Sequence, residues 1–102
     1  MSQFNDIIHQ EQPVLIDFYA DWCGPCKQMA PVLKEVKSRL GDGIRILKID
    51  VDRHPKLAAQ LQVRGVPTLV LYRSGKLLWR QAGLQSASEL IRIIQSQLER
   101  TP

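Results

Sequence analysis

Cys23 and Cys26 are the only cysteines of the chain, and two residues separate them. A pair at this spacing can cycle between dithiol and disulfide, because the second thiol can attack a mixed disulfide formed on the first. The attacking sulfur must be a thiolate, and a helix start favours one, since its unpaired backbone donors and positive dipole end stabilise an anion. The sequence places Cys23 at such a start. The spacing therefore predicts thiol–disulfide exchange.

Zinc and iron–sulfur sites also use pairs of cysteines at this spacing. A tetrahedral zinc site needs four ligands, and beyond the cysteines only His9 and His54 are available, far apart and without the usual histidine spacing. We therefore expect no metal site within one chain. Two other functions stay open: a binding module that holds a partner without turnover, and a metal or iron–sulfur scaffold in which two chains each supply Cys23 and Cys26.

Asp17 is the other residue with unusual chemistry, because it interrupts the almost continuously apolar run Val14–Tyr19. Such a run is typical of a strand buried on both faces. A carboxylate buried there costs several kcal/mol unless it is neutralised or paired, and desolvation raises its pKa. Asp17 is therefore a candidate functional group, with a purely structural buried ion pair as the alternative.

The elements that must position these groups follow from hydrophobic periodicity and from turn residues. The cysteines lie between the first strand and an amphipathic helix that continues to Leu40, is expected to kink at Pro31, and ends at Gly41-Asp42-Gly43. The later expected elements are a strand at Ile44–Val51, a short helix at Pro55–Gln62, strands at Thr68–Tyr72 and Lys76–Gln81 joined by Arg73-Ser74-Gly75, and a final helix capped by Ser86 or Ser88 with Leu90, Ile91, Ile94 and Leu98 on its core face. This order predicts an α/β fold with a central mixed sheet and helices on both faces.

Length and charge narrow the class of protein. The chain has 102 residues, which suit a single domain spanning 1–102, and a formal net charge of +4 without the basic run expected of a nucleic-acid-binding arm. No apolar stretch approaches the roughly 18 residues of a membrane span, and the first residues lack a signal-peptide layout. We therefore expect a cytoplasmic protein that binds neither nucleic acid nor membrane. In that reducing compartment a structural disulfide is disfavoured, which strengthens the catalytic interpretation of the cysteines.

Two motifs give the chain a family resemblance. Trp22-Cys23-Gly24-Pro25-Cys26-Lys27 resembles the active-site sequence of the thioredoxin family, and Arg64-Gly65-Val66-Pro67-Thr68 matches a second family motif. The resemblance implies a protein-disulfide reductase with no bound cofactor beyond a redox-active Cys23–Cys26 disulfide. It also implies that disulfide-containing proteins are the substrates, and that an NADPH- or ferredoxin-dependent thioredoxin reductase is the electron donor.

The resemblance also implies residue roles. Cys23 would be the exposed nucleophile and Cys26 the buried resolving thiol, with Asp17 exchanging a proton with Cys26 and Lys48 lying near Asp17. Pro67 would be a cis-proline beside the disulfide that leaves the Val66 backbone free to pair with substrate, and a side chain in place of Gly83 would obstruct the groove. The full substrate-binding set implied in this way is Trp22, Gly24, Pro25, Val66, Pro67 and Gly83.

The chain departs from the family pattern at two places. Tyr19 stands where many members have a tryptophan. Phe4 matches a position in the family's first helix, so the strand that normally precedes that helix is expected to be missing. Its absence would expose the edge of the strand at Ile44–Asp50, which predicts dimerisation or weaker stability, and so a monomer or a weak dimer. Arg45 and Lys48 could instead act as charged residues that prevent edge pairing.

Overall fold

A computed structural model describes residues 2–100 of the chain. Its elements, in chain order, are α1 (Ser2–Ile8), β1 (Val14–Tyr19), α2 (Gly24–Leu40), the 3₁₀ turn η1 (Gly41–Gly43), β2 (Arg45–Asp50), α3 (Pro55–Gln60), β3 (Thr68–Arg73), β4 (Lys76–Ala82) and α4 (Ala87–Arg100). The sequence therefore predicted each of the four strands to within one residue at either end.

The four strands form one mixed sheet in the order β2-β1-β3-β4. β1 is central, parallel to β2 and antiparallel to β3, and β3 and β4 form an antiparallel hairpin. Within residues 2–100 no strand precedes β1, and β2 is an edge strand, as expected from the early position of Phe4. The predicted α/β fold with a central mixed sheet is confirmed, and the described residues contain four of its strands.

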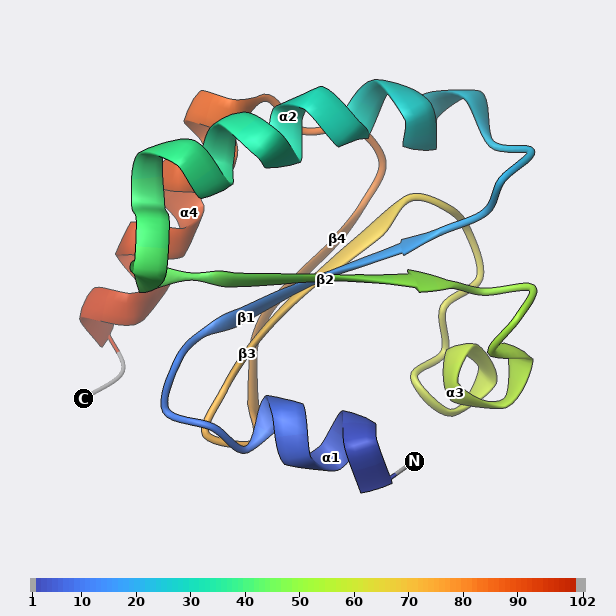
Figure 1. The fold of residues 1–102 in the computed structure, drawn as a ribbon, viewed down its shortest axis with the longest axis horizontal. Coiled ribbons are helices and arrows are strands. Elements are labelled where there is room, and N and C mark those ends of the chain that lie inside the picture. Colours follow the sequence, from blue (N-terminus) through green and yellow to red (C-terminus); the bar gives the residue numbers. More distant parts are fainter. Residues whose placement is uncertain (1, 101–102) are drawn as a thin grey trace.

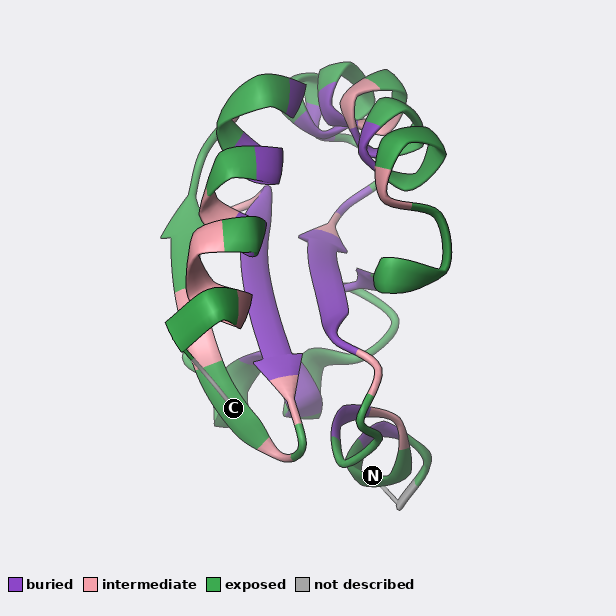
Figure 2. Ribbon diagram, turned by 90° about the vertical axis from the view of Figure 1, so that its left-hand side faces the viewer, coloured by how far each residue is buried: buried purple, intermediate pink, exposed green. Residues whose placement is uncertain are grey.

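Helices cover both faces of the sheet. Figure 1 shows α2 and α4 on one face and α1 and α3 on the other. Alternate residues of β1 belong to different cores, because successive side chains of a strand point to opposite faces. Leu15 packs in the α2/α4 core, whereas Ile16 and Phe18 pack in the α1/α3 core. β1 and β3 are buried along nearly their whole length (Figure 2), so the sheet is a rigid base for the residues at its ends.

Local interactions explain where the helices begin and end. The Ser86 hydroxyl accepts a hydrogen bond from the Glu89 N–H at 3.1 Å, so Ser86 rather than Ser88 caps α4. α3 stops at Gln60, two residues earlier than predicted, and Gln62 adopts a left-handed φ of 55° that is incompatible with continuing the helix. α2 includes Pro31, and the kink expected there stays a prediction. The helix ends at Leu40, and its C-cap Gly41 also has a left-handed φ of 55°.

Candidate active site

The cysteine pair lies at the amino terminus of α2, immediately beyond the carboxyl end of β1. Cys23 is the N-cap residue, with extended backbone angles, and its Sγ accepts a hydrogen bond from the Cys26 N–H at 3.1 Å. The two residues form a disulfide with a Cα–Cα separation of 5.3 Å, within the usual range. In the reduced protein the same backbone donor and the helix dipole would stabilise a thiolate on Cys23.

Both cysteines are buried in the disulfide form, with 3% of Cys23 and 5% of Cys26 exposed. The expectation of an exposed Cys23 beside a buried Cys26 is therefore wrong for this state. The Cys23 Sγ lies only 3.7 Å from the Val66 carbonyl oxygen, and Ala20 and Val66 pack against the pair. Local packing thus covers both sulfurs, and exposure does not tell the nucleophile from the resolving thiol.

The loop before β3 forms the other wall of the site. The Val66–Pro67 peptide bond is cis, as the motif predicted, and Pro67 is buried. The Pro67 carbonyl accepts a hydrogen bond from the Gly83 N–H at 2.9 Å, which joins the end of β4 to this loop. A Cβ on Gly83 would meet no atom of the chain within 4 Å, but its φ of 94° strongly favours glycine. Gly83 is therefore favoured at this position by its backbone conformation, and not by a steric clash that a side chain would make within the chain.

An apolar surface surrounds the covered disulfide. Trp22 is 71% exposed, Gly24 and Pro25 are exposed, and Val66 is half-buried. Leu84, which sequence reasoning missed, is 47% exposed and directly follows Gly83. Its only sequence signal is its place after Gly83, which the family resemblance already singled out.

Two aspartates at the end of β2 hold Trp22 in place, and sequence reasoning missed both. The Trp22 Nε1 donates a hydrogen bond to the Asp52 Oδ2 at 2.8 Å. Asp50 is buried, and its Oδ1 accepts from the Asp52 N–H at 2.9 Å, which fixes the turn that presents Asp52. A usable signal was their place at the carboxyl end of a strand parallel to β1, since such ends meet at one edge of a sheet.

Asp17 is fully buried, and neither of its carboxylate oxygens has a hydrogen-bond partner among the described residues. Desolvation raises the pKa of Asp17 from 3.8 to about 6, and the nearby Lys48 ammonium opposes the shift. The carboxyl group can therefore exchange a proton near neutral pH, which an exposed aspartate would not do.

Strand register places Lys48 beside Asp17, because these two residues are direct partners across β1 and β2. Leu15 and Ile46 belong to the α2/α4 core, so by alternation Asp17 and Lys48 also face α2. The Lys48 ammonium lies 4.7 Å from the centre of the Tyr19 ring. Lys48, Tyr19 and Cys26 line one hollow of about 240 Å³.

No cluster of three or more potential metal ligands exists among residues 2–100. In the same part of the chain, no helix is long and apolar enough to cross a bilayer.

The family model described as Thioredoxin matches residues 1–96 of the chain. The chain belongs to the thioredoxin family. It is 49% identical over 84 residues to the thioredoxin-like protein slr0233 of Synechocystis sp., covering 82% of this chain and 80% of that protein. It is 41% identical to the thioredoxin of Acidithiobacillus ferridurans, covering 91% of this chain and 86% of that protein. A solved structure of a mutant thioredoxin from Halobacterium salinarum superimposes with a TM-score of 0.88 at 39% identity, covering 100% of this chain and 88% of that one.

Plant relatives are longer. The chain is 42% identical to the chloroplastic thioredoxin Y of rice over 96% of its own length, but it spans only 59% of that relative. The family match and the joined pair Cys23–Cys26 together make this thioredoxin-family protein a thiol–disulfide oxidoreductase with a redox-active disulfide. Members of this family need no cofactor, are reduced by thioredoxin reductase and act on disulfide substrates.

Proposed function

We propose that the protein works as a reductant of disulfides in other proteins, with Cys23 as the nucleophile and Cys26 as the resolving thiol. The observation that carries this assignment is the N-cap geometry, in which the Cys26 N–H already donates to the Cys23 Sγ. A thiolate on Cys23 would keep this hydrogen-bond donor and would be stabilised by the helix dipole, so Cys23 is the better placed of the two to be the nucleophile.

In the first step, the Cys23 thiolate attacks one sulfur of a substrate disulfide. A new bond forms between Cys23 and that sulfur, the substrate disulfide breaks, and the other substrate sulfur leaves as a thiolate that takes up a proton. The product is a mixed disulfide. The apolar surface of Trp22, Pro25, Val66 and Leu84 would hold the substrate segment, with the Val66 backbone available for pairing.

In the second step, Cys26 loses its proton and attacks the Cys23 sulfur, which releases the reduced substrate and forms the Cys23–Cys26 disulfide. Asp17 is the proposed proton acceptor, since its pKa of about 6 leaves it ionised but basic near neutral pH. The Lys48 ammonium is proposed to stabilise the ionised Asp17 carboxylate by electrostatic attraction. Two electrons pass in all from the dithiol to the substrate disulfide.

The proposal extends to partners and location. Thioredoxin reductase, dependent on NADPH or ferredoxin, would return two electrons to the disulfide. The proposed location is the cytoplasm, because a reductant needs a compartment in which thiols stay reduced, and the chloroplast named for the plant relatives is the alternative.

The proposed assembly is a single domain that is monomeric or at most a weak dimer, since Arg45 and Lys48 on β2 would repel a second copy. Light scattering from micromolar to millimolar concentration tests this assembly.

Insulin reduction driven by dithiothreitol tests the redox assignment. The wild type should accelerate precipitation of the insulin B chain, and Cys23→Ser should be no faster than dithiothreitol alone. Cys26→Ser is the matched variant: it keeps the nucleophile and should accumulate a mixed disulfide, visible by intact mass spectrometry without reductant. Equal slow rates for wild type and Cys23→Ser would remove the reductase function, and trapping on Cys23→Ser instead of Cys26→Ser would reverse the two roles.

A further inference from the structure

The open edge of β2 lies between two hollows that neither cysteine lines, although Lys48 contributes to both. A groove of about 520 Å³ lies on the α1/α3 side, and a hollow of about 240 Å³ lies on the α2 side. β2 contributes to both, with Leu47 and Ile49 in the first and Ile46 in the second. The edge and the two hollows therefore form one continuous surface.

The backbone of β2 offers hydrogen bonds at this edge. Arg45 N–H donates to Pro13 O at 2.8 Å and Val51 N–H donates to Tyr19 O at 2.9 Å, so the odd-numbered residues of β2 bond to β1. By alternation, Ile46 and Lys48 direct their N–H and C=O groups outward. Within residues 2–100 no strand pairs with these groups, and unpaired edges of this kind bind extended segments.

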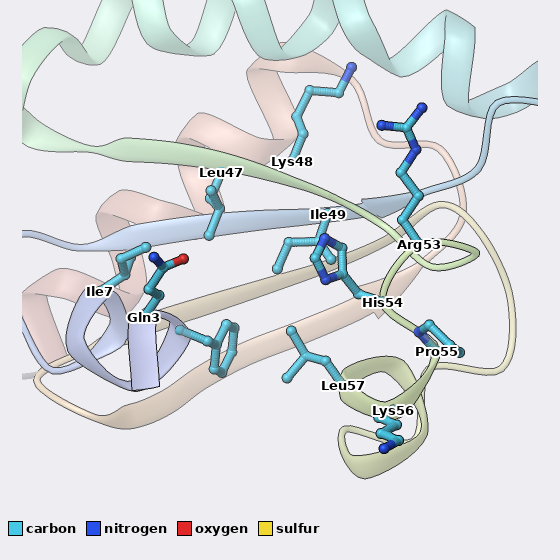
Figure 3. Close-up of a pocket in the computed structure, with 11 residues that line it drawn as sticks. Gln3, Ile7, Leu47, Lys48, Ile49, Arg53, His54, Pro55, Lys56 and Leu57 are labelled. Atoms are coloured by element: carbon cyan, nitrogen blue, oxygen red, sulfur yellow. The ribbon is translucent and has the colours of Figure 1, made fainter. Parts of the chain in front are cut away.

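The two sides of the edge differ in chemistry. Figure 3 shows Leu47 and Ile49 directed toward α1 and α3, and Lys48 directed toward α2. The groove on the α1/α3 side has a mainly apolar floor with cationic residues at its margin and no carboxylate among its lining residues. Its apolar lining residues are Phe4, Ile7, Leu47, Ile49, Pro55 and Leu57.

The opposite hollow is cationic, since three of the six residues that line it are lysines. Lys37 is engaged, because its ammonium donates to the carbonyls of Gly41 and Ile44. Lys34 forms no ion pair with a described residue, whereas the Lys48 ammonium lies over the Tyr19 ring and acts on the Asp17 carboxylate. A strand added beside β2 would thus direct one set of side chains toward apolar groups and the other set toward a cationic hollow in which the Lys34 ammonium lacks an ion-pair partner among the described residues.

We propose that the β2 edge binds an extended segment of a partner protein in which apolar residues alternate with aspartate or glutamate. Alternation of side chains along a strand matches the two unlike sides of the edge. A second copy of this chain fits poorly, because β2 has the sequence RILKID and would bring Arg45 and Lys48, rather than alternating carboxylates, to an edge that is already cationic. The site is separate from the surface around Trp22 and needs no cysteine in the partner.

Binding of a fluorescein-labelled peptide to the oxidised protein tests the proposal. The probe is a capped seven-residue peptide of alternating valine and glutamate, and the comparison peptide has lysine in place of glutamate. We expect saturable binding of the glutamate peptide alone, measured by fluorescence anisotropy at low salt. Amide exchange at Ile46 and Lys48, followed by NMR, should slow when that peptide is bound.

Lys34→Glu should weaken binding by about fivefold or more, because it replaces an attraction by a repulsion at an exposed site. Lys76→Glu is the matched control, since Lys76 is exposed on β4, at the far edge of the sheet, and it should bind as the wild type does. Both variants should reduce insulin normally. Equal binding of the two peptides, protection at β4 or around Cys23 instead of β2, or a protein dimer that occupies the β2 edge would each overturn the proposal.

Discussion

Asp17 carries the clearest consequence at the scale of single residues. Its pKa is raised from 3.8 to about 6, so the folded state holds this proton more tightly than the unfolded chain does. The folded state is therefore favoured below about pH 4, and this stabilisation is lost as pH rises through about 6. A shift of this size corresponds to about 3 kcal/mol.

Asp17→Asn should remove that pH dependence. From pH 3 to pH 7 the free energy of unfolding of the variant should rise relative to wild type by about 3 kcal/mol, measured by urea unfolding at each pH. The substitution should also slow release of the mixed disulfide, because the proposed proton acceptor is gone. Asp6→Asn, at an exposed position on α1, is the control and should leave the pH profile unchanged. If the stability of Asp17→Asn and of the wild type depended on pH in the same way, burial would not raise the pKa of the Asp17 carboxyl.

The hydrogen bond between Trp22 and Asp52 predicts a separate effect on substrate binding. Asp52→Ala removes the acceptor for the indole N–H, so Trp22 should gain motion. The KM for insulin should rise about two- to fivefold with little change in kcat, because an exposed hydrogen bond of about 1 kcal/mol is lost and no reacting atom is touched. Time-resolved anisotropy of Trp22, in a Trp79→Phe background, should show the motion directly. Asp42→Ala is the control for loss of an exposed carboxylate; an equal change in KM there would indicate a general charge effect.

The sequence identified the candidate residues of the active site better than it predicted which residues they contact. The cysteine spacing and the position of Asp17 in an apolar run were visible because they depend on neighbours in the chain. Asp52 was missed because its partner, Trp22, lies 30 residues away and only the fold brings the two together. The burial of Cys23 was missed for the same reason, since Val66 covers it from a distant loop.

At the scale of elements, the caps decide where helices start. Ser86→Ala should lower the free energy of unfolding by about 1 kcal/mol, because the Glu89 N–H loses its acceptor at the start of α4. Ser88→Ala is a matched control on the same helix, where the hydroxyl caps nothing, and it should change stability by less than about 0.5 kcal/mol. Urea unfolding measures both. A larger loss of stability in Ser88→Ala than in Ser86→Ala would show that Ser88, not Ser86, is the cap.

Strands were easier to predict than helix ends. β1 and β3 are buried on both faces, so their apolar runs have sharp boundaries in the sequence. The choice between Ser86 and Ser88 could not be made from residue types alone, because both are good caps and only packing of α4 selects one. The early end of α3 likewise follows from the left-handed conformation of Gln62, a residue with no such preference in the sequence.

At the scale of the whole molecule, the two cores share one sheet. β1 supplies Leu15 to the α2/α4 core and Ile16 to the α1/α3 core, so neither core can unfold while the other keeps its strands. We expect a single cooperative transition, with coincident urea curves from far-ultraviolet circular dichroism and from tryptophan fluorescence. Two separate transitions would contradict the prediction of one domain. The topology itself was predictable, because a βαβ order followed by a hairpin leaves few arrangements of one sheet.

The position of α4 in the chain has a consequence for synthesis on the ribosome. Ala87, Leu90, Ile91 and Ile94 complete the core beneath α2, and they come from a helix that follows all four strands in the chain. While the ribosome is still adding these residues, the apolar side of α2 can pack against Leu15 and Leu71 of the sheet but not yet against α4, although the cysteine pair has already been translated. The nascent chain therefore carries reactive thiols next to an incompletely covered core, and early contact with a chaperone at this stage would protect it from both aggregation and wrong disulfides.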